Sequence, residues 1–469
     1  MPVAPLKKRP ARPLAARIAA LQGLVRGLVP VPDAWLKTAA KASSKNDKDG
    51  DGTDDGGTME CLPCNSYREL IMSWRKAMRW TDGLDHALAV MLASVASTKA
   101  VGDQLWIKVI GPAACGKSTL CEAISVNHEY VLAKSTIRGF HSGYKLDSPE
   151  EGGSGGEQDH SLIPQIRGKT LVTKDGDTLL QSPNLSQILA EARDLYDSTS
   201  RTHYRNAMSK DYSGVRMTWL LCGTSSLRSI DSSELGERFL DCVIMDGIDD
   251  DLEDEILWRV ANRADRNLAL ESGTDAASQH EPALAEAMQL TGGYVSHLRE
   301  NASKALAAIT LPDAAKHQCT RLGKFVAFMR ARPSYHQEEV AERELAARLV
   351  SQHVRLAKCL AFVLNKNEVD AEVMRRVRQV ALDTSRGQTL AIAAHLHGTG
   401  DIGLEPTSLA HLLTKEDSRV RTLLRFLKAI HVTEVYQPKV SKGVKGRPRY
   451  RLTTKLRKLF DEVFPQATT

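Results

Sequence analysis

One eight-residue segment constrains this chain more than any other. Residues 111–118 read Gly-Pro-Ala-Ala-Cys-Gly-Lys-Ser, which matches the pattern G-x-x-x-x-G-K-[ST]. An apolar segment, residues 104–110 (QLWIKVI), precedes the pattern, and a helical segment, Lys117 to Ser125, follows it. Because the pattern binds nucleotide phosphates when it joins a strand to a helix, the sequence predicts a nucleotide-binding α/β domain.

The pattern also assigns roles to single residues. Small residues let backbone N–H groups curl around a β-phosphate at a helix N-terminus, where the helix dipole favours anions. We expect Lys117 to span the β- and γ-phosphates, Ser118 to offer its hydroxyl to Mg²⁺, and Thr119 to reach the α-phosphate. ATP and Mg²⁺ are therefore the predicted cofactors. The predicted nucleotide-binding residues are Gly111, Pro112, Ala113, Ala114, Cys115, Gly116, Lys117, Ser118 and Thr119.

Further strands and helices alternate downstream of this loop. Residues 169–174, 216–222 and 240–245 read as strands, and residues 185–196 read as a helix. Such alternation is typical of a parallel sheet covered by helices. From residue 250 to residue 394 the pattern is helical, with no clear strand.

Acidic residues follow the strand of residues 169–174, which is the second strand of the chain if that of residues 104–110 is the first. A strand beside a phosphate-binding loop often ends in an Asp that holds Mg²⁺. Asp175 fits this position, and Asp177 is the competing candidate. Motor ATPases usually have a Glu after that Asp, but Gly176 stands here. Either Asp177 activates water, or a carboxylate from elsewhere does, or hydrolysis is slow; the Asp-Gly-Asp sequence is also a turn signal.

Two more residues suit a role in hydrolysis. Thr224 follows the third strand, where an ATPase senses the γ-phosphate, although a cap or turn role is the plain alternative. Arg238 precedes the fourth strand. In ring ATPases an Arg at this place reaches the γ-phosphate of the neighbouring subunit, where it stabilises the charge of the transition state; a surface charge is the alternative.

With these motifs, the chain resembles the AAA+ ATPases, and in particular the minichromosome maintenance (MCM) branch of replicative helicases and related phage or mobile-element ATPases. The resemblance covers residues 104–390. It implies a helical lid in which Arg348 is the sensor-2 residue that touches the γ-phosphate, with Arg355 as a second Arg seven residues later.

The same resemblance implies a DNA-engaging hairpin within residues 201–212, with Arg201, Arg205 and Lys210 facing the pore of a ring. Three features depart from the MCM pattern. The Glu after Asp175 is absent, the sensor position holds Thr instead of Asn, and no OB-fold barrel precedes the loop.

Composition narrows the class of protein further. The chain has 469 residues, of which 42% are hydrophobic, 26% charged and only 5% aromatic. These values favour a globular, helix-rich protein of about two to four domains over a β-sandwich. No apolar run reaches the ~18 residues of a transmembrane helix, and the start lacks a secretory signal. Because its eight cysteines lie mostly in apolar segments, we expect a cytoplasmic protein of a bacterium or a phage.

The first 60 residues read as a basic arm followed by an acidic linker. Residues 1–40 hold seven Lys and Arg against one Asp, whereas residues 41–58 are rich in Gly and Asp. A basic, acid-poor start also resembles an organellar transit peptide, which the absence of Ser before Ser43 disfavours.

Two metal-like patterns near this linker lack ligands. Asp47, Asp49 and Asp51 match the start of a calcium-binding loop, but no carboxylate stands at the twelfth position of that loop. Cys61 and Cys64 form one CxxC pair without a second pair to complete a zinc site. A solvated acidic linker and an unligated cysteine pair are the preferred interpretations.

The C-terminal 68 residues are strongly basic, with 14 Lys and Arg against 6 Asp and Glu. Such an excess indicates an acidic partner, most often nucleic acid. Two helical segments, 408–413 and 417–430, precede a β-ribbon of residues 432–436 and 450–452. This is the layout of a winged helix, in which a recognition helix reads DNA and a basic wing contacts phosphates; protein contacts are the alternative. The predicted DNA-binding residues are Arg419, Arg421, Arg425, Lys442, Lys445, Arg447 and Arg449.

Together these features predict an α/β protein with a P-loop (AAA+) parallel sheet, a helical lid and a winged helix. The expected segments are the arm and linker 1–60, the nucleotide-binding domain 61–247, the lid 248–397 and the winged helix 402–469. The predicted function is an ATP-dependent DNA motor that forms a ring, expected to be a hexamer, without a membrane partner. One alternative is a regulatory ATPase that switches its winged helix without translocation; a small-molecule kinase is another.

Overall fold

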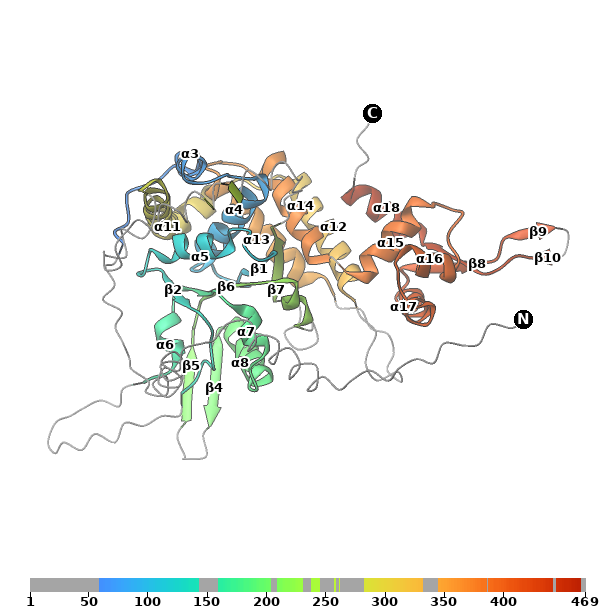
Figure 1. The fold of residues 1–469 in the computed structure, drawn as a ribbon, viewed down its shortest axis with the longest axis horizontal. Coiled ribbons are helices and arrows are strands. Elements are labelled where there is room, and N and C mark those ends of the chain that lie inside the picture. Colours follow the sequence, from blue (N-terminus) through green and yellow to red (C-terminus); the bar gives the residue numbers. More distant parts are fainter. Residues whose placement is uncertain are drawn as a thin grey trace, which may run out of the picture. The chain divides into compact units, whose positions relative to one another are not determined.

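The computed structural model describes residues 59–142, 159–203, 209–230, 238–244, 257–258, 261, 282–331, 345–385, 387–441 and 444–464 (Figure 1). The chain divides into two units, residues 1–56 and 57–469, and the description below concerns the second. The predicted basic arm and the calcium-like residues Asp47, Asp49 and Asp51 lie outside the described residues.

A five-stranded sheet, parallel throughout, forms the centre of the fold (Figure 1). This confirms the predicted α/β class with a parallel sheet. Across the sheet the strands are ordered β2-β3-β6-β1-β7, so that β6 lies between β1 and β3. The strands are β1 (Trp106–Ile110), β2 (Val131–Lys134), β3 (Thr170–Thr173), β6 (Thr218–Gly223) and β7 (Phe239–Val243).

Successive side chains of each strand point to opposite faces of the sheet. The two faces therefore belong to two different hydrophobic cores. In β1, Ile107 and Val109 belong to one core, whereas Trp106 and Ile110 belong to the other. All five residues of β1 are buried. The sheet therefore forms the middle layer of an α/β/α arrangement. Its central strand is β6, and β1, the strand that precedes the Gly-rich loop, lies beside it.

Helices from both ends of the chain cover the first face (Figure 1). They are α3 (Tyr67–Ala77), α4 (Asp82–Ser97), α5 (Lys117–Ser125), α11 (Pro282–Ala308), α12 (Asp313–Arg330), α13 (Ala347–Val363) and α14 (Ala371–Ser385). The second face packs against α6 (Leu162–Ile166), α7 (Gly176–Leu180), α8 (Leu185–Tyr196) and the 3₁₀ turn η1 (Ser225–Ser229). The helices predicted at residues 117–125 and 185–196 are confirmed.

The helices ahead of the sheet begin at side-chain caps. The Ser66 hydroxyl accepts a hydrogen bond from the Glu69 N–H at the start of α3, and the Thr81 hydroxyl accepts one from the Leu84 N–H at the start of α4. Each cap satisfies an N–H group that has no intrahelical partner. The caps fix where both helices start. Helix α4 packs against β1, β6 and β7 on the first face of the sheet.

Helix α14 closes the outer edge of strand β7. The Thr384 hydroxyl accepts a hydrogen bond from the Asp241 N–H at 2.9 Å, and a carboxylate oxygen of Asp383 accepts one from the Val243 N–H at 2.8 Å. Side chains of a helix thus replace the next strand of the sheet. On the inner side, β7 is tied to β1 by a buried ion pair between Lys108 and Asp241, whose atoms lie 3.0 Å apart.

An antiparallel pair of strands, β4 (Thr199–His203) and β5 (Ser209–Ser213), follows α8 (Figure 1). It occupies the segment in which the sequence predicted a hairpin. Arg205 belongs to that prediction and lies outside the described residues.

The C-terminal segment alternates helices and short strands. It consists of α15 (Gln388–Gly398), α16 (Pro406–Leu412), α17 (Asp417–Ala429), β8 (Thr433–Tyr436), β9 (Lys439–Ser441), β10 (Val444–Lys445), β11 (Arg449–Leu452) and α18 (Thr454–Val463). Strands β8 and β11 pair antiparallel, as predicted, and β9 pairs with β10. Helix α18 was not predicted; its Phe460 ring lies 5.2 Å from that of Phe325 on α12.

The proposed domain boundaries near residues 247 and 402 stay predictions. Among the described residues, none of the helices is both long enough and apolar enough to pass through a membrane.

Candidate functional site

The loop of residues 111–118 joins the end of β1 directly to the start of α5. Two glycines give it room. A Cβ at Gly111 would lie 2.7 Å from the Cys115 sulfur, and Gly116 has a φ of +87° with Leu84 of α4 only 3.0 Å from its Cβ position. The Gly116 position therefore favours glycine for its left-handed backbone, and a side chain at Gly111 would displace the Cys115 sulfur.

The first turn of α5 presents backbone N–H groups to solvent. Its N-cap is Gly116, which supplies no side-chain hydrogen bond, so the N–H groups that open the helix have no partner within it. Ala114 adopts a φ of +60°, a conformation uncommon for a residue with a Cβ. Ala113, Ala114 and Ser118 are exposed. An open helix N-terminus of this kind attracts anions.

The Lys117 ammonium group folds back over the loop. It donates hydrogen bonds to the carbonyl oxygens of Gly111, at 2.8 Å, and Pro112, and it lies 3.5 Å from the Cys115 sulfur. The cation is therefore held against the carbonyl oxygens that begin the loop. This places the predicted phosphate-binding residues together on one short segment.

Strand register brings two other predicted residues to the same edge of the sheet. The Gly111 N–H donates to the Gly223 carbonyl at 3.2 Å, so the end of β1 meets the end of β6, and Thr224 follows. Strand β3 pairs with β6 up to Thr173, two residues before Asp175. Because all these strands are parallel, their carboxyl ends share one edge.

Asp175 serves as the N-cap of α7. Its carboxylate accepts hydrogen bonds from both the N–H, at 3.0 Å, and the hydroxyl of Thr178. These bonds lower the pKa of the Asp175 carboxyl group, so the group is anionic at neutral pH. The side chain is exposed, and a carboxylate accepting two bonds keeps lone pairs for water or a cation.

Asp177 is bound to Thr224. Its two carboxylate oxygens accept hydrogen bonds from the Thr224 N–H, at 2.9 Å, and from the Thr224 hydroxyl, at 3.0 Å. Between the two acids, Gly176 is packed so tightly that a Cβ would lie 2.8 Å from Leu221 and Leu227. The fold therefore has no room for a Glu at position 176, and it joins the second acid to the predicted sensor residue.

Arg238 and Arg348 converge on one aromatic ring at the opposite edge of the sheet. Their guanidinium carbons lie 5.4 and 5.6 Å from the centre of the Tyr196 ring. Arg238 also forms an ion pair with Asp197 at 2.9 Å; the Arg side chain is 12% exposed and the Asp side chain 57%. Sequence reasoning missed Tyr196 and Asp197, which have no motif and are recognisable only by their position at the end of α8.

This edge lies far from the loop of the same chain. Arg238 directly precedes β7, whereas Ile244, just after β7, bonds to the end of β1. At about 3.3 Å per residue, six residues of strand separate the two ends by roughly 20 Å. Arg355, the other Arg of the predicted lid, instead donates to the carbonyl oxygens of Ala100, at 3.1 Å, and Val101.

The predicted DNA-binding residues of the β4–β5 pair differ in exposure. The Arg201 side chain is 76% exposed and forms an ion pair with Asp211 at 3.0 Å. Lys210 is largely buried, because its ammonium group contacts the Asp159 carboxylate and the Ser161 hydroxyl. Of these two cations, only Arg201 is open to a partner.

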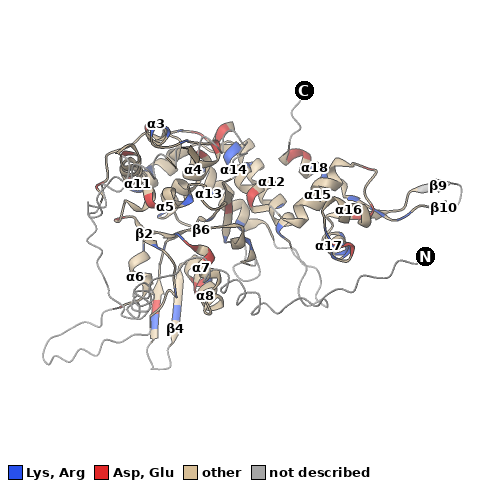
Figure 2. Cartoon of the chain, in the orientation of Figure 1, with Lys and Arg blue, Asp and Glu red and all other residues tan. Residues whose placement is uncertain are grey.

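Of the predicted C-terminal residues whose side chains are described, four are exposed and Arg449 is half-buried: the exposed ones are Arg419, Arg421, Arg425 and Arg447. Figure 2 marks the Lys and Arg positions along these elements in blue. Arg421 pairs with Asp417 one turn earlier on α17, at 2.5 Å. Arg419 and Arg425 are exposed on the same helix, and within the described part of the chain no carboxylate forms an ion pair with either. Arg447 and Arg449 both lie within 4.0 Å of the Glu405 carboxylate. Lys442 and the side chain of Lys445 lie outside the described residues.

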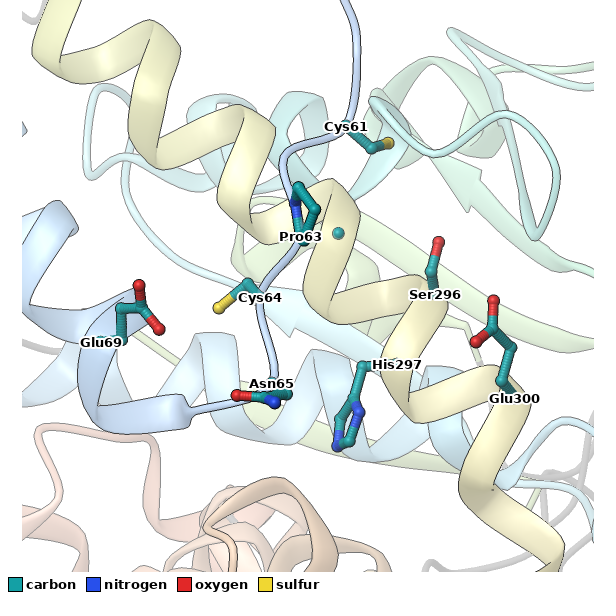
Figure 3. A pocket seen from close by; sticks show the side chains of 9 residues that line it. Cys61, Pro63, Cys64, Asn65, Glu69, Ser296, His297 and Glu300 are labelled. Carbon is teal, nitrogen blue, oxygen red and sulfur yellow. The ribbon is translucent and has the colours of Figure 1, made fainter.

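The CxxC pair lines a pocket of about 410 Å³ beside α11 (Figure 3). The Cys61 thiol donates to the Val126 carbonyl at 3.9 Å, and the Cys64 thiol donates to the Ser66 carbonyl at 3.6 Å. Figure 3 shows the two sulfurs pointing apart. Both cysteines are free thiols, and burial raises the pKa of each. The pair therefore forms neither a disulfide nor a shared ligand set in this conformation.

The site therefore consists of the loop of residues 111–118 at the carboxyl ends of the strands and an arginine pair at their amino ends. Sequence reasoning missed a third group, the buried residues His86, Cys242 and Asp383, because no spacing pattern links them. A comparison with protein-family models finds no match for the chain, and a search of curated proteins finds no match either.

Proposed function

We propose that the chain binds ATP with Mg²⁺ at residues 111–119 and hydrolyses it. The observation that carries the proposal is the loop itself. Gly111 and Gly116 lie at its closely packed positions, the N-terminus of α5 follows, and the Lys117 ammonium group folds back over the loop. N–H groups and a cation around one concave surface match a nucleotide phosphate chain. The Ser118 hydroxyl, at the start of α5, is the proposed Mg²⁺ ligand.

The acidic residues of the same edge divide the remaining chemistry. Asp175 is exposed, anionic and capable of holding Mg²⁺ through water. Asp177 is the proposed group that orients the attacking water, since it is the acid bound to Thr224 beside the loop. A carboxylate and a hydroxyl held by two hydrogen bonds form a rigid pair, which suits sensing of a γ-phosphate.

The arginine pair acts on a neighbouring subunit in this proposal. An Arg side chain cannot span the roughly 20 Å of strand between the two edges of its own sheet. Arg238 and Arg348 lie together on the Tyr196 ring. Because Arg238 is 12% exposed and paired with Asp197, it has to leave this ion pair to reach the loop of a second copy. Completing each site across an interface makes hydrolysis depend on a ring, as the AAA+ resemblance implies.

DNA is the proposed substrate of the motor. The order α16, α17, β8, β11 fits a winged helix, and α17 presents Arg419 and Arg425 to solvent. Cations free of carboxylates are available to phosphates, and their binding releases counterions from DNA. We therefore assign the chain to DNA-acting AAA+ ATPases with an MCM-like arrangement, in which α17 and the β9–β10 ribbon hold the duplex.

Nucleotide binding is tested first, with Lys117→Ala. Loss of the cation should abolish binding of a fluorescent ATP analogue in the presence of Mg²⁺, because the β- and γ-phosphates lose their main counter-charge. Lys99→Ala is the matched control, since Lys99 is an exposed lysine after α4. Equal affinity of the two variants would contradict the proposed nucleotide site.

A mixing experiment separates the motor from its alternative, a regulatory ATPase that works alone. The tight packing of Gly176 favours this alternative, because it excludes the usual Glu. Arg238→Ala subunits keep an intact loop, and Lys117→Ala subunits keep an intact arginine. Mixed assemblies of the two should regain part of the ATPase activity, since some interfaces combine both intact halves. No recovery in assemblies shown to contain both variants would move the assignment to the regulatory ATPase.

A further inference from the structure

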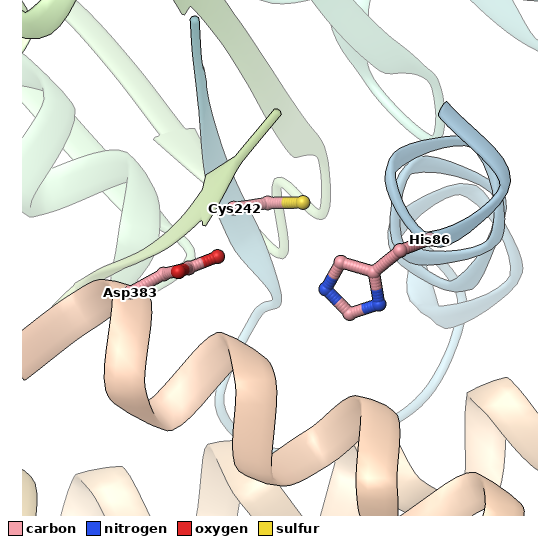
Figure 4. A group of neighbouring side chains, drawn as sticks. All are labelled: His86, Cys242 and Asp383. Carbon is pink, nitrogen blue, oxygen red and sulfur yellow. The ribbon is translucent and has the colours of Figure 1, made fainter. Parts of the chain in front are cut away.

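Three potential metal ligands from distant segments meet in the core of the molecule. They are His86 on α4, Cys242 on β7 and Asp383 on α14 (Figure 4). One ligand atom of each residue lies within 4.8 Å of the other two, and all three residues are buried. The fold alone brings them together, at the edge of the sheet where α14 covers β7.

The imidazole of His86 supplies an independent observation. The residue is 7% exposed, and its buried Nε2 atom has no hydrogen-bond partner among the described residues. Figure 4 shows the ring turned toward Cys242 and Asp383. A buried polar nitrogen without a partner is costly, and a metal ion bound between the three side chains would satisfy this one.

Asp383 is already oriented for such a ligand. One oxygen of its carboxylate accepts from the Val243 N–H at 2.8 Å, and the other accepts from the Gln379 side chain at 3.0 Å. A carboxylate offers about four lone-pair sites in all, more than a single hydrogen bond to each oxygen uses. Ligands held by outer hydrogen bonds of this kind are typical of protein metal sites.

We propose that His86, Cys242 and Asp383 bind one divalent transition-metal ion, with zinc as the best match. Nitrogen, sulfur and carboxylate oxygen are the donors that Zn²⁺ takes in proteins. A thiolate and a carboxylate neutralise the dication, while imidazole adds a neutral donor. Zinc ligands in a tetrahedral site lie about 3.5 Å apart, so binding draws the three side chains together by about 1 Å.

Binding has a defined proton balance. The Cys242 thiol loses its proton to solvent as the metal–sulfur bond forms, and His86 binds as the neutral imidazole. Of the two arginines whose charges act on His86, Arg376 is paired with Asp85 at the start of α4, and Arg375 is the other. The thiolate and the carboxylate offset the charge of the dication at the site itself. The ion would tie α4, β7 and α14 into one unit at the edge of the sheet, independently of nucleotide.

The test uses the full chain, refolded or purified without chelators, and measures metal directly. Elemental analysis should find about one zinc per chain. Metal-free protein given Co²⁺ should develop the near-ultraviolet absorption band of a thiolate–cobalt bond. The Cys242→Ser chain should lack this band, and His86→Gln should bind cobalt at least tenfold more weakly. Cys359→Ser is the matched control, because Cys359 is another buried free thiol, and it should keep the band.

Folding is monitored on the same samples by circular dichroism, so that loss of metal is not confused with loss of structure. If Cys242→Ser unfolds, the comparison of His86→Gln with Cys359→Ser decides. Folded, metal-free wild-type protein that takes up neither zinc nor cobalt would overturn the site. Metal retained at full affinity by both Cys242→Ser and His86→Gln would overturn it as well and place the ion elsewhere.

Discussion

Gly176 lies between Asp175 and Asp177, where neighbouring residues leave no space for a side chain. A Cβ there would lie 2.8 Å from Leu221 and Leu227 and 3.0 Å from the Cys222 carbonyl oxygen. Contacts that close are not tolerated by packed cores. The carboxylate that binds Thr224 with both of its oxygens belongs to the next residue, Asp177.

This arrangement makes Asp177→Asn informative. We expect the rate of ATP hydrolysis to fall about 10²-fold, the lower range for removal of a general base, while ATP affinity stays within about threefold. Asn keeps an oxygen for the Thr224 N–H, so the fold should be preserved. Asp175→Asn is the comparison and should instead weaken Mg²⁺-dependent binding. Steady-state kinetics measures the hydrolysis rate. An unchanged rate in Asp177→Asn would mean that Asp177 has only a structural role.

His353 carries a different single-residue effect. It is fully buried on α13, neither ring nitrogen has a hydrogen-bond partner within the described residues, and burial lowers its pKa to about 4. The unfolded chain binds that proton near pH 6.5. Stability is therefore complete above this pH and falls as the pH drops from 6.5 toward 4, because only the unfolded state gains the proton.

His353→Leu should remove this dependence. Between pH 7 and pH 5 the wild-type chain should lose about 2 kcal/mol of unfolding free energy through this residue alone, and the variant should not. Urea denaturation at both pH values measures the difference. An identical loss in the two proteins would mean that other groups account for the acid sensitivity.

At the scale of elements, α17 combines a buried stripe with an exposed basic face. Leu423, Leu424 and Leu427 are buried, whereas Arg419 and Arg425 are exposed. Apolar packing on the buried face holds such a helix in place, and the cations on its exposed face stay accessible to a partner.

Arg425→Glu tests that face without disturbing the stripe. We expect weaker binding to duplex DNA and a shallower dependence of the binding constant on salt, with the log–log slope reduced by about one. Lys304→Glu on α11 makes the same charge change at another exposed position and should leave the slope unaltered. Fluorescence anisotropy over a salt series gives both numbers, and equal slopes for the two variants would point the C-terminal segment toward protein partners.

Elements with strong local signals could be predicted from the sequence, and short or context-dependent ones could not. Helices α5 and α8 begin and end where their periodicity indicated. Strand β2 has four residues with one buried side chain, too little alternation to separate it from a loop. Helix α18 does carry an apolar stripe, of Leu456, Leu459, Phe460 and Val463, which the sequence interpretation overlooked.

The candidate site divides in the same way. The loop is local, so its residues were identified together. The convergence of Arg238 and Arg348 on Tyr196 depends on three segments that meet only in the folded chain. The meeting of His86, Cys242 and Asp383 also depends on the order of the strands, and no local pattern of side chains specifies that order.

At the scale of the whole molecule, the C-terminal segment shares a core with the rest of the described unit. Phe460 is 4% exposed, and its ring lies 5.2 Å from that of Phe325 on α12 and 4.8 Å from that of His397 on α15. Removing residues after 400 would expose the α12 face that α18 covers. Loss of DNA binding in such a truncated chain would therefore have two causes, which charge reversal on α17 separates.

Phe460→Ala measures this coupling. We expect the free energy of unfolding to fall by about 3 kcal/mol, the low end for truncating a buried Phe. Phe464→Ala should cost less, because that ring is only half-buried. Thermal or urea unfolding of the two variants supplies the comparison. A loss for Phe460→Ala as small as that for Phe464→Ala would mean that the C-terminal segment is stable without this contact.

The capping of β7 by α14 has a consequence for how copies of the chain can meet. An exposed edge strand is a template on which the strand of another molecule can add, and this route leads to fibrils and swapped dimers. In β7, the N–H groups of Asp241 and Val243 are already occupied by side chains of Thr384 and Asp383. Sheet continuation from one molecule into the next is thereby blocked at this edge. Pairing of another strand with β7 would require α14 to detach first. At this edge, an ordered assembly must therefore use contacts between side chains in place of backbone pairing.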